Sequence, residues 1–365
     1  MKTLFRYVAT SYLATFVGVL LAVMTVFLVT DFVDRAKAYS GPNWLIHVIE
    51  LYGWKAILAT QQLGPAAILL AAGVTVSAIR KRGELTALDA LAFGPRSVYV
   101  PIGILAFVIA GALIAVDEFG VVAAGPKVDQ IMVERFNRWG DWRFYYQPKQ
   151  WYRRGDRIFY LKNGELAQGY EDVTILKLSP QFALSQRIDA KRMVHVEGTR
   201  WRLFDVADRT FDGQGQSRVE VNDVREYDLA APSDAFRILK GRPEQMRLAR
   251  IREQIEARED VGLPMNQFML ALHNRFAYPL AAVPAALLAV GLALRRERKG
   301  HVTAAVVEGL VVTMTLWGVT VVCKTLVLSD RMSPILAAWM PALVLIVGAW
   351  LARPVGVARP GRRSA

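Results

Sequence analysis

The sequence contains one cysteine, Cys323, in 365 residues. A single cysteine cannot form an intramolecular disulfide or an all-cysteine metal site, so any water-exposed domain must be stable through its core alone. The 4 histidines are His47, His195, His273 and His301. They lie far apart in the sequence and do not have the spacing of a metal-binding motif, so we expect no metal site.

Sequence motifs of common enzymes are also absent. The chain has no G-x-x-x-x-G-K-[ST] phosphate loop, so it does not itself bind ATP in the usual way. It has no H-E-x-x-H zinc helix and no G-x-S-x-G nucleophile elbow. The sequence therefore contains no catalytic constellation that would support the alternative of a membrane-bound enzyme with its active site in an outer domain.

Apolar residues, by contrast, are abundant. They make up 53% of the chain, and the mean hydropathy is +0.26, which is too apolar for an average soluble protein. Charged residues still make up 21%, with a net charge of +13. The composition predicts a membrane protein with a water-exposed part or strongly basic flanks.

Six apolar runs are long enough to be membrane-spanning helices, since a hydrocarbon core of about 30 Å needs about 20 helical residues. No small-residue cleavage site follows the first run, so we interpret it as an uncleaved helix. The fifth run contains Glu308, for which we expect an ordinary ion pair, and Lys324, for which snorkelling and lining a cavity remain alternatives. The runs are residues 7–30, 56–79, 97–116, 276–294, 302–329 and 332–352.

The positions of lysine and arginine predict the orientation of these helices. With six spans, the basic clusters at residues 2–6, 80–96, 295–299 and 353–363 all fall on one side of the membrane. Both termini are therefore predicted to be cytoplasmic. Attraction to anionic lipid explains these clusters, so the high pI of 9.9 does not indicate nucleic-acid binding.

Between the third and fourth spans lies a segment of about 150 residues, enough for a domain. Its short β-rich stretches predict seven or eight antiparallel strands in a sandwich or jelly roll. Residues 243–258 have the pattern of an amphipathic connecting helix. The stretches, in order, are residues 151–152, 157–161, 173–178, 182–187, 193–196, 199–206 and 218–221, with turn signals at 155–156, 163–164, 179–180, 197–198 and 212–213.

The predicted fold class is therefore a membrane α-helical protein of six transmembrane helices with an extracytoplasmic antiparallel β-jelly-roll domain. The predicted domains are residues 1–118 with the first three spans, residues 119–262 with the jelly roll and connecting helix, and residues 263–365 with the last three spans.

The cytoplasmic loop between the second and third spans predicts a short helix at about residues 82–93. An acidic residue, Glu84, lies in its first turn, and Gly94-Pro95 ends it. Such a helix can dock into the groove of a partner protein or lie on the lipid headgroups, and the pattern alone does not separate these alternatives.

Several segments resemble the lipopolysaccharide-export permeases of the LptF/LptG family. Residues 84–90, ELTALDA, are similar to the family's coupling helix, and residues 64–70, GPAAILL, to its second span. Residues 117–119 with Pro126 are similar to its exit from the third span, and residues 272–280 to its fourth-span entry. The resemblance covers nearly the whole chain, and residues 32–34 and 151–160 look closer to LptG.

The resemblance implies a transporter membrane subunit, not an enzyme, in the bacterial inner membrane with a large periplasmic domain. It implies a second permease of the same family, a cytoplasmic ATPase dimer that uses ATP, and a periplasmic jelly-roll bridge protein that receives lipopolysaccharide. No cofactor is expected on this chain. A permease or scaffold of the same architecture for another lipid or envelope component remains an alternative.

The resemblance also implies sites. Contacts with the ATPase would come from Glu84, Leu85 and Leu88, and the first, second and fifth spans would line a cavity for acyl chains. Asp31 stands where some LptG proteins carry a substrate-binding lysine. Ala90-Leu91-Ala92 replaces the usual Ala-Ser-Gly after the coupling helix, so we expect that helix to be one turn longer. Candidate cations near the lipid A phosphates are Arg35, Lys37, Lys55, Lys127 and Arg135.

Overall fold

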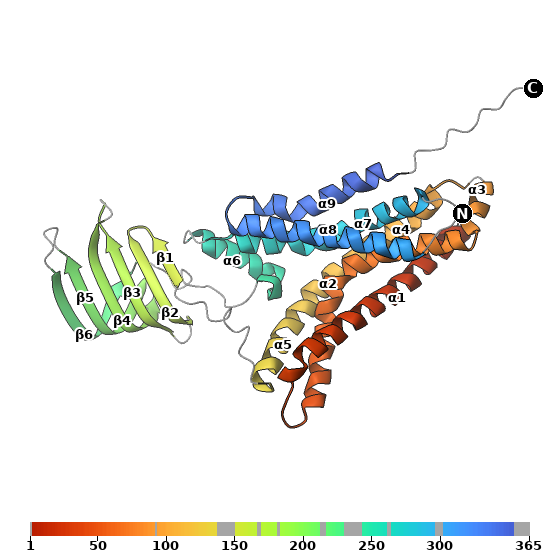
Figure 1. The fold of residues 1–365 in the computed structure, drawn as a ribbon. Coiled ribbons are helices and arrows are strands. Elements are labelled where there is room, and N and C mark those ends of the chain that lie inside the picture. The colour runs from red at the N-terminus through yellow and green to blue at the C-terminus, as the bar shows by residue number, and fades with distance from the viewer. Residues whose placement is uncertain are drawn as a thin grey trace, which may run out of the picture. The chain divides into compact units, whose positions relative to one another are not determined.

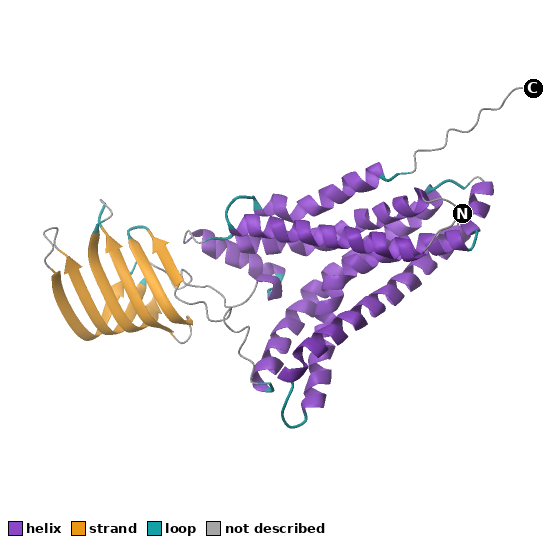
Figure 2. Ribbon diagram, viewed as in Figure 1, coloured by secondary structure: helices purple, strands orange, loops and turns teal. Residues whose placement is uncertain are grey.

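The computed structural model describes residues 2–91, 93–136, 150–165, 169–180, 183–211, 217–229, 243–260, 264–295 and 302–353. The chain divides into two compact units (Figures 1 and 2). The helical unit comprises Met1–Arg138 and Met269–Ala365, and the β unit comprises Trp139–Phe268.

The helical unit contains six helical stretches long and apolar enough to cross a membrane, which confirms the predicted spans. All six follow the order of the apolar runs in the sequence, and the last two have nearly the predicted bounds. The first four extend well beyond their runs. Its helices are α1 (Lys2–Arg35), α2 (Trp44–Lys81), α3 (Glu84–Ala90), α4 (Arg96–Ala115), α5 (Val122–Glu134), α7 (Asn266–Arg295), α8 (Val302–Leu328) and α9 (Pro334–Leu351).

The third span continues past its predicted end. After α4, a π-helical turn, η2 (Val116–Val121), leads directly into α5, so the helical stretch runs from Arg96 to Glu134. The predicted domain boundary at residue 118 therefore lies inside a helix, and the observed one follows Arg138. The second boundary lies after Phe268 instead of residue 262. Helix α5 stays helical because its apolar side packs on α2 through Val128 and Ile131.

Helix α2 forms the centre of the bundle. Its alanines at positions 67, 71 and 72 are fully buried, and small side chains allow neighbouring helices to approach closely. Helix α1 packs on it through Val8 and Tyr12, and the Tyr12 hydroxyl donates a hydrogen bond to the Ile68 carbonyl oxygen at 3.1 Å. The other core contacts come from α4 and α7, through residues such as Ile102, Ala106, Ala286 and Val290.

The β unit contains one six-stranded antiparallel sheet in which the strands follow their sequence order. This confirms the prediction of an antiparallel, jelly-roll-like domain. Its buried face is formed by Phe159, Ile175, Met193, Trp201 and Leu203. The strands are β1 (Gln150–Arg154), β2 (Arg157–Glu165), β3 (Gly169–Leu178), β4 (Leu184–Glu197), β5 (Arg200–Phe211) and β6 (Ser217–Asp228).

Two details of the strands differ from the prediction. The stretches 182–187 and 193–196 belong largely to one long strand, β4, because no turn residue separates them and Ala190 is buried in the sheet. The signal Asn163-Gly164 is not a turn, because both residues pair with β3 within β2. Phe182 and the signal 212–213 lie outside the described residues.

The connecting helix predicted at 243–258 is shorter at its start. A 3-10 turn, η5, occupies Pro243–Gln245, and helix α6 then runs from Leu248 to Asp260. Ile251 on α6 is fully buried, as an amphipathic helix requires, but the polar Gln254 and Arg258 are buried as well.

Candidate transport sites in the membrane helices

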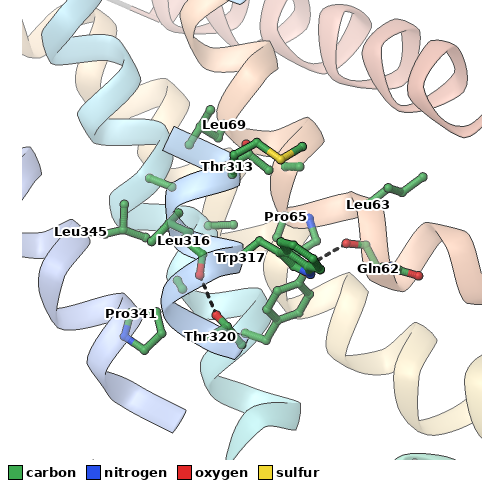
Figure 3. A pocket seen from close by; sticks show the side chains of 16 residues that line it. Gln62, Leu63, Pro65, Leu69, Thr313, Leu316, Trp317, Thr320, Pro341 and Leu345 are labelled. Atoms are coloured by element: carbon green, nitrogen blue, oxygen red, sulfur yellow. Dashed lines mark hydrogen bonds between the residues drawn. The ribbon is translucent and has the colours of Figure 1, made fainter. Parts of the chain in front are cut away.

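A cavity of about 320 Å³ lies between α2, α7, α8 and α9 (Figure 3). This volume is at the lower end of the range for small-molecule sites, about 300–1,000 Å³. Helix α2 contributes Leu63, Pro65 and Leu69, and α8 contributes Leu316 and Trp317. The cavity walls are therefore mostly aliphatic and aromatic.

The hydroxyl groups that line this cavity already donate hydrogen bonds to backbone carbonyls. Tyr278 donates to the carbonyl oxygen of Gln62 at 2.6 Å, and Thr313 and Thr320 donate to backbone carbonyls one helical turn earlier at 2.8 and 2.9 Å. These hydroxyl groups therefore have no hydrogen left to donate to a ligand, although their oxygens can still accept. The cavity is consequently suited to an apolar group such as a hydrocarbon chain.

The helices around the cavity differ in part from the expected set. The second and fifth spans, α2 and α8, contribute as expected, but no described residue of α1 lines this cavity. Helices α7 and α9 take its place with Ala281, Ala285 and Leu345.

A second site lies where α1 and α2 meet, at the end of the bundle opposite to the amino terminus. Asp31 on α1 binds Lys55 Nζ at 2.5 Å and Arg35 Nε at 2.9 Å, and it accepts a hydrogen bond from Tyr52 at 2.8 Å. The side chains of Asp31 and Lys55 are 17% and 13% exposed, whereas that of Arg35 is 50% exposed. Two of the five predicted cations therefore share one carboxylate.

The other three predicted cations are exposed and lie outside this cluster. Lys37 follows α1 in the 3-10 turn η1 (Ala36–Ala38). Lys127 lies on α5, where its Nζ donates to the Gln130 side chain at 3.3 Å, and Arg135 follows directly after α5. Apolar contacts place α5 beside the same end of α1 and α2, through Phe32, Tyr39, Tyr52, Ile131 and Phe136.

A third group of charges is more deeply buried. Arg275 on α7 binds Asp117 at 2.5 Å and Glu118 at 2.8 Å, and its side chain is only 2% exposed. Both acidic residues lie in the π-turn η2. Such turns are frequent at functional sites, and charges inside a membrane protein normally pair in this way.

Sequence reasoning missed this ion-pair group. The apolar run of the fourth span starts at Phe276, so Arg275 appeared to lie outside the membrane helix, whereas α7 begins at Asn266. The available signal was that an arginine and two acidic residues each adjoin a long apolar run.

The predicted coupling helix is α3. Leu85 is 8% exposed and belongs to the core cluster of α1, α2 and α4, so it anchors α3 to the bundle. Leu88 is half-buried. Glu84 accepts a hydrogen bond from the Tyr7 hydroxyl at 2.7 Å and lies 3.9 Å from Arg82. The carboxylate therefore already has partners within this chain.

The expected extra turn of α3 does not form. The helix ends at Ala90, and the Phe93 amide then donates to the Leu88 carbonyl with a wider, five-residue spacing. This contact turns the chain toward Gly94 and Pro95 before α4 begins. Leu91 is left 70% exposed.

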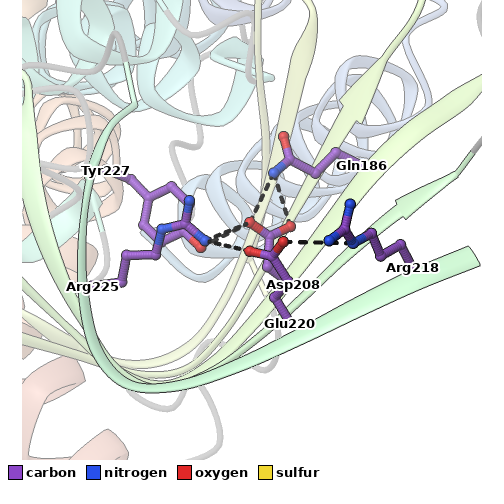
Figure 4. Close-up of polar contacts among 6 residues, drawn as sticks. All are labelled: Gln186, Asp208, Arg218, Glu220, Arg225 and Tyr227. Carbon is purple, nitrogen blue, oxygen red and sulfur yellow. Dashed lines mark hydrogen bonds and ion pairs between the residues drawn. The ribbon is translucent and has the colours of Figure 1, made fainter.

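The β unit has a polar cluster on the buried face of its sheet (Figure 4). Asp208 is 6% exposed and accepts hydrogen bonds from Gln186 at 2.8 Å and from Tyr227 at 2.9 Å. Arg225 lies 3.8 Å from Asp208 and 3.2 Å from Glu220. Burial raises the pKa of Tyr227, and the bond to Asp208 raises it further, so the hydroxyl remains a donor.

The chain as a whole matches one family model, which is described as "Lipopolysaccharide export system permease LptF/LptG" and aligns with residues 6–353. The chain belongs to the LptF/LptG family. This assignment and the six apolar helices make it a multi-pass permease of the inner membrane. The model describes LptF and LptG together, so closeness to LptG stays a prediction. No match to a curated protein was found.

Proposed function

We propose that this chain is the permease subunit of an ATP-driven exporter that extracts lipopolysaccharide from the inner membrane and transfers it to a periplasmic jelly-roll bridge. The observation that carries the proposal is an apolar cavity of about 320 Å³ in the membrane helices of an LptF/LptG-family chain. Its hydroxyl groups bond to backbone carbonyls, so an acyl chain is the part of lipopolysaccharide that fits it.

The phosphates of lipopolysaccharide would lie near the far ends of α1, α2 and α5. Arg35 is half exposed, and Lys37, Lys127 and Arg135 are exposed, so these four cations are accessible to a headgroup. Lys55 is held by Asp31, and a phosphate would have to compete with that carboxylate. We therefore expect Lys55 to contribute less to binding than the exposed cations.

Partner subunits would cover the remaining apolar surface and supply the energy. The apolar stretches of α1 and α8 are only 6% and 11% buried, and a second permease of the family would pack on them. An ATPase dimer would bind α3, with Glu84 and Leu88 as contacts. In the predicted orientation α3 and both termini are cytoplasmic, and the β unit is periplasmic.

Site-specific photo-crosslinking in the assembled complex tests this function. A photoreactive residue at Trp317 in the cavity should form lipopolysaccharide adducts, whereas one at Val322, on the same helix but outside the cavity wall, should form few. In the β unit, Tyr227 on the buried face should react and the exposed Val221 on the opposite face of β6 should not.

The result also separates the proposal from its alternative. Adducts formed only with phospholipid at Trp317 would contradict lipopolysaccharide export and favour transport of another lipid. No lipid adduct above the level at Val322 would contradict any role of the cavity in transport.

A further inference from the structure

We propose that Tyr7 is a positioning residue that links the coupling helix α3 to α1, so that movement of α3 is transmitted along α1 to the opposite end of the bundle. This inference rests on the proposed function, because it assumes that an ATPase moves α3. It assigns a role to a residue at the amino-terminal end of α1 that none of the sites above requires.

The link between α3 and α1 consists of a polar contact and a shared apolar cluster. The Tyr7 hydroxyl donates to Glu84 Oε2 at 2.7 Å, and Arg82 Nη1 donates to the same hydroxyl at 3.5 Å. Leu85, the next residue of α3, is buried in the core cluster that also contains Val8 of α1. Figure 1 shows α3 beside the amino-terminal end of α1. The Tyr7–Glu84 bond thus joins the two helices directly, and Leu85 and Val8 belong to one buried cluster.

The connection between α3 and α2 is a turn with a special backbone conformation. Gly83, between the two helices, has φ of +78°, a conformation that favours glycine, and a Cβ atom there would contact nothing within 4 Å. The turn is closed by the Gly83 amide, which donates to the Arg80 carbonyl at 2.9 Å. A side chain at position 83 would therefore touch nothing, and the Tyr7–Glu84 bond is a link from α3 to α1 in addition to this turn.

Helix α1 has the properties needed to transmit a displacement. It is continuous over 34 residues, or about 51 Å, and contains no proline. Helices α2, α4, α7 and α9 each contain an internal proline, such as Pro65 in α2, whereas α8 shares with α1 the absence of proline. Only 6% of the apolar stretch of α1 is buried, compared with 67% of that of α2, so α1 has fewer packing contacts to break when it moves.

The opposite end of α1 carries the charges that would meet the headgroup. Asp31 and Arg35 lie in its last turns, and Asp31 binds both Arg35 and Lys55. A shift of α1 against α2 changes the Asp31–Lys55 contact directly, since Lys55 belongs to α2. The Tyr7–Glu84 bond therefore connects α3 to the candidate phosphate site through one rigid helix.

The experiment compares Tyr7→Phe with wild type in the complete transporter reconstituted in liposomes, and measures lipopolysaccharide released per ATP hydrolysed. The substitution removes only the hydroxyl group. Loss of a hydrogen bond to a carboxylate predicts a ratio at least about fivefold lower, with ATPase turnover within about twofold of wild type. A variant that was merely less stable would lower both rates together and leave the ratio unchanged.

Two further variants keep the test specific. Tyr99→Phe is the matched control, because the buried Tyr99 hydroxyl has no hydrogen-bond partner among the described residues and its loss should leave the ratio unchanged. Glu84→Gln retains an oxygen that can accept from Tyr7 but loses the charge. It should therefore keep a higher ratio of release to hydrolysis than Tyr7→Phe, whatever its ATPase rate.

The outcomes distinguish this inference from the function on which it rests. A wild-type ratio in Tyr7→Phe, or a ratio that falls equally in Tyr99→Phe, would overturn the link. Failure of the Tyr7→Phe chain to co-purify with the ATPase would also overturn it, because the hydroxyl would then serve docking and not transmission. If the wild-type chain releases no lipopolysaccharide with ATP, the proposed function itself is wrong.

Discussion

Helices α1 and α2 are neighbours of similar length, yet they are packed very differently. Helix α1 is the more apolar, with a mean hydropathy of 2.5 against 1.7, but only 6% of its apolar stretch is buried compared with 67% for α2. The difference arises from small residues, since α2 carries Gly64, Gly73 and several alanines where other helices cross it. The helix at the centre of this bundle is therefore the one whose small residues allow close packing, and not the more apolar one.

The comparison also assigns different functions to the two helices. The packed set of α2, α4 and α7 would serve as a fixed frame, and α1 would be the part that contacts lipid or a partner and moves. Substitutions in the frame should therefore lower stability, whereas comparable substitutions at the exposed positions of α1, which exclude the buried Val8 and Tyr12, should affect transport alone.

The largest effect is expected from Arg275→Met. It leaves Asp117 and Glu118 without their buried cation and should destabilise the protein by about 3–5 kcal/mol. Arg35→Met on α1 is the matched control. It removes an ion pair whose arginine is 50% exposed and should cost about 0–1 kcal/mol. Denaturant unfolding in detergent measures both variants, and equal losses would contradict the division into frame and moving helix.

A smaller effect is expected from Ala72→Leu in α2. Ala72 is fully buried, so the added atoms should overpack the core and cost about 1–3 kcal/mol. Gly18→Leu on α1 adds a side chain where a Cβ would meet nothing within 4 Å, and its effect should stay within about 0.5 kcal/mol. Thermal unfolding of the two variants compares them. If Gly18→Leu were as unstable as Ala72→Leu, α1 would be closely packed around Gly18, which would contradict the difference from α2.

A third variant alters the cavity without disturbing the frame. Ala281→Phe should fill part of the cavity and weaken binding of an acyl chain about tenfold, with little change in stability. Val311→Phe on the exposed side of α8 is the control. Lipopolysaccharide binding to the purified complex measures the difference. Unchanged binding in Ala281→Phe would mean that the acyl chain lies elsewhere.

The amino-acid sequence predicts the helices well because each must present about 20 apolar residues to the bilayer. It does not predict the continuation of α4 into α5. The apolar run ends at Val116, and the ion pair of Asp117 with Arg275, which is distant in the sequence, compensates that charge inside the helical stretch. Similarly, β4 is one strand because sheet pairing continues through Asp189 and Ala190, where the polar pattern suggests a gap.

The candidate sites show the same contrast between local motifs, which can be predicted from the sequence, and contacts between distant residues, which cannot. The position of α3 is evident from its local motif and its glycine and proline stops. The bond between Tyr7 and Glu84 joins residues 77 positions apart, and the pairing of Asp31 with Lys55 requires the register of two helices. The cavity depends on four helices and has no local pattern at all. Such contacts are set by packing and not by neighbours in the sequence.

The most direct test of this account is ATP-driven release of lipopolysaccharide from liposomes that contain the chain with its natural partner subunits. We predict release to a soluble jelly-roll acceptor only when ATP is present, and at least about tenfold less release for Glu84→Ala. Release that does not depend on ATP, or release by Glu84→Ala at the wild-type rate, would contradict the proposed role of this chain as an ATP-coupled lipopolysaccharide permease.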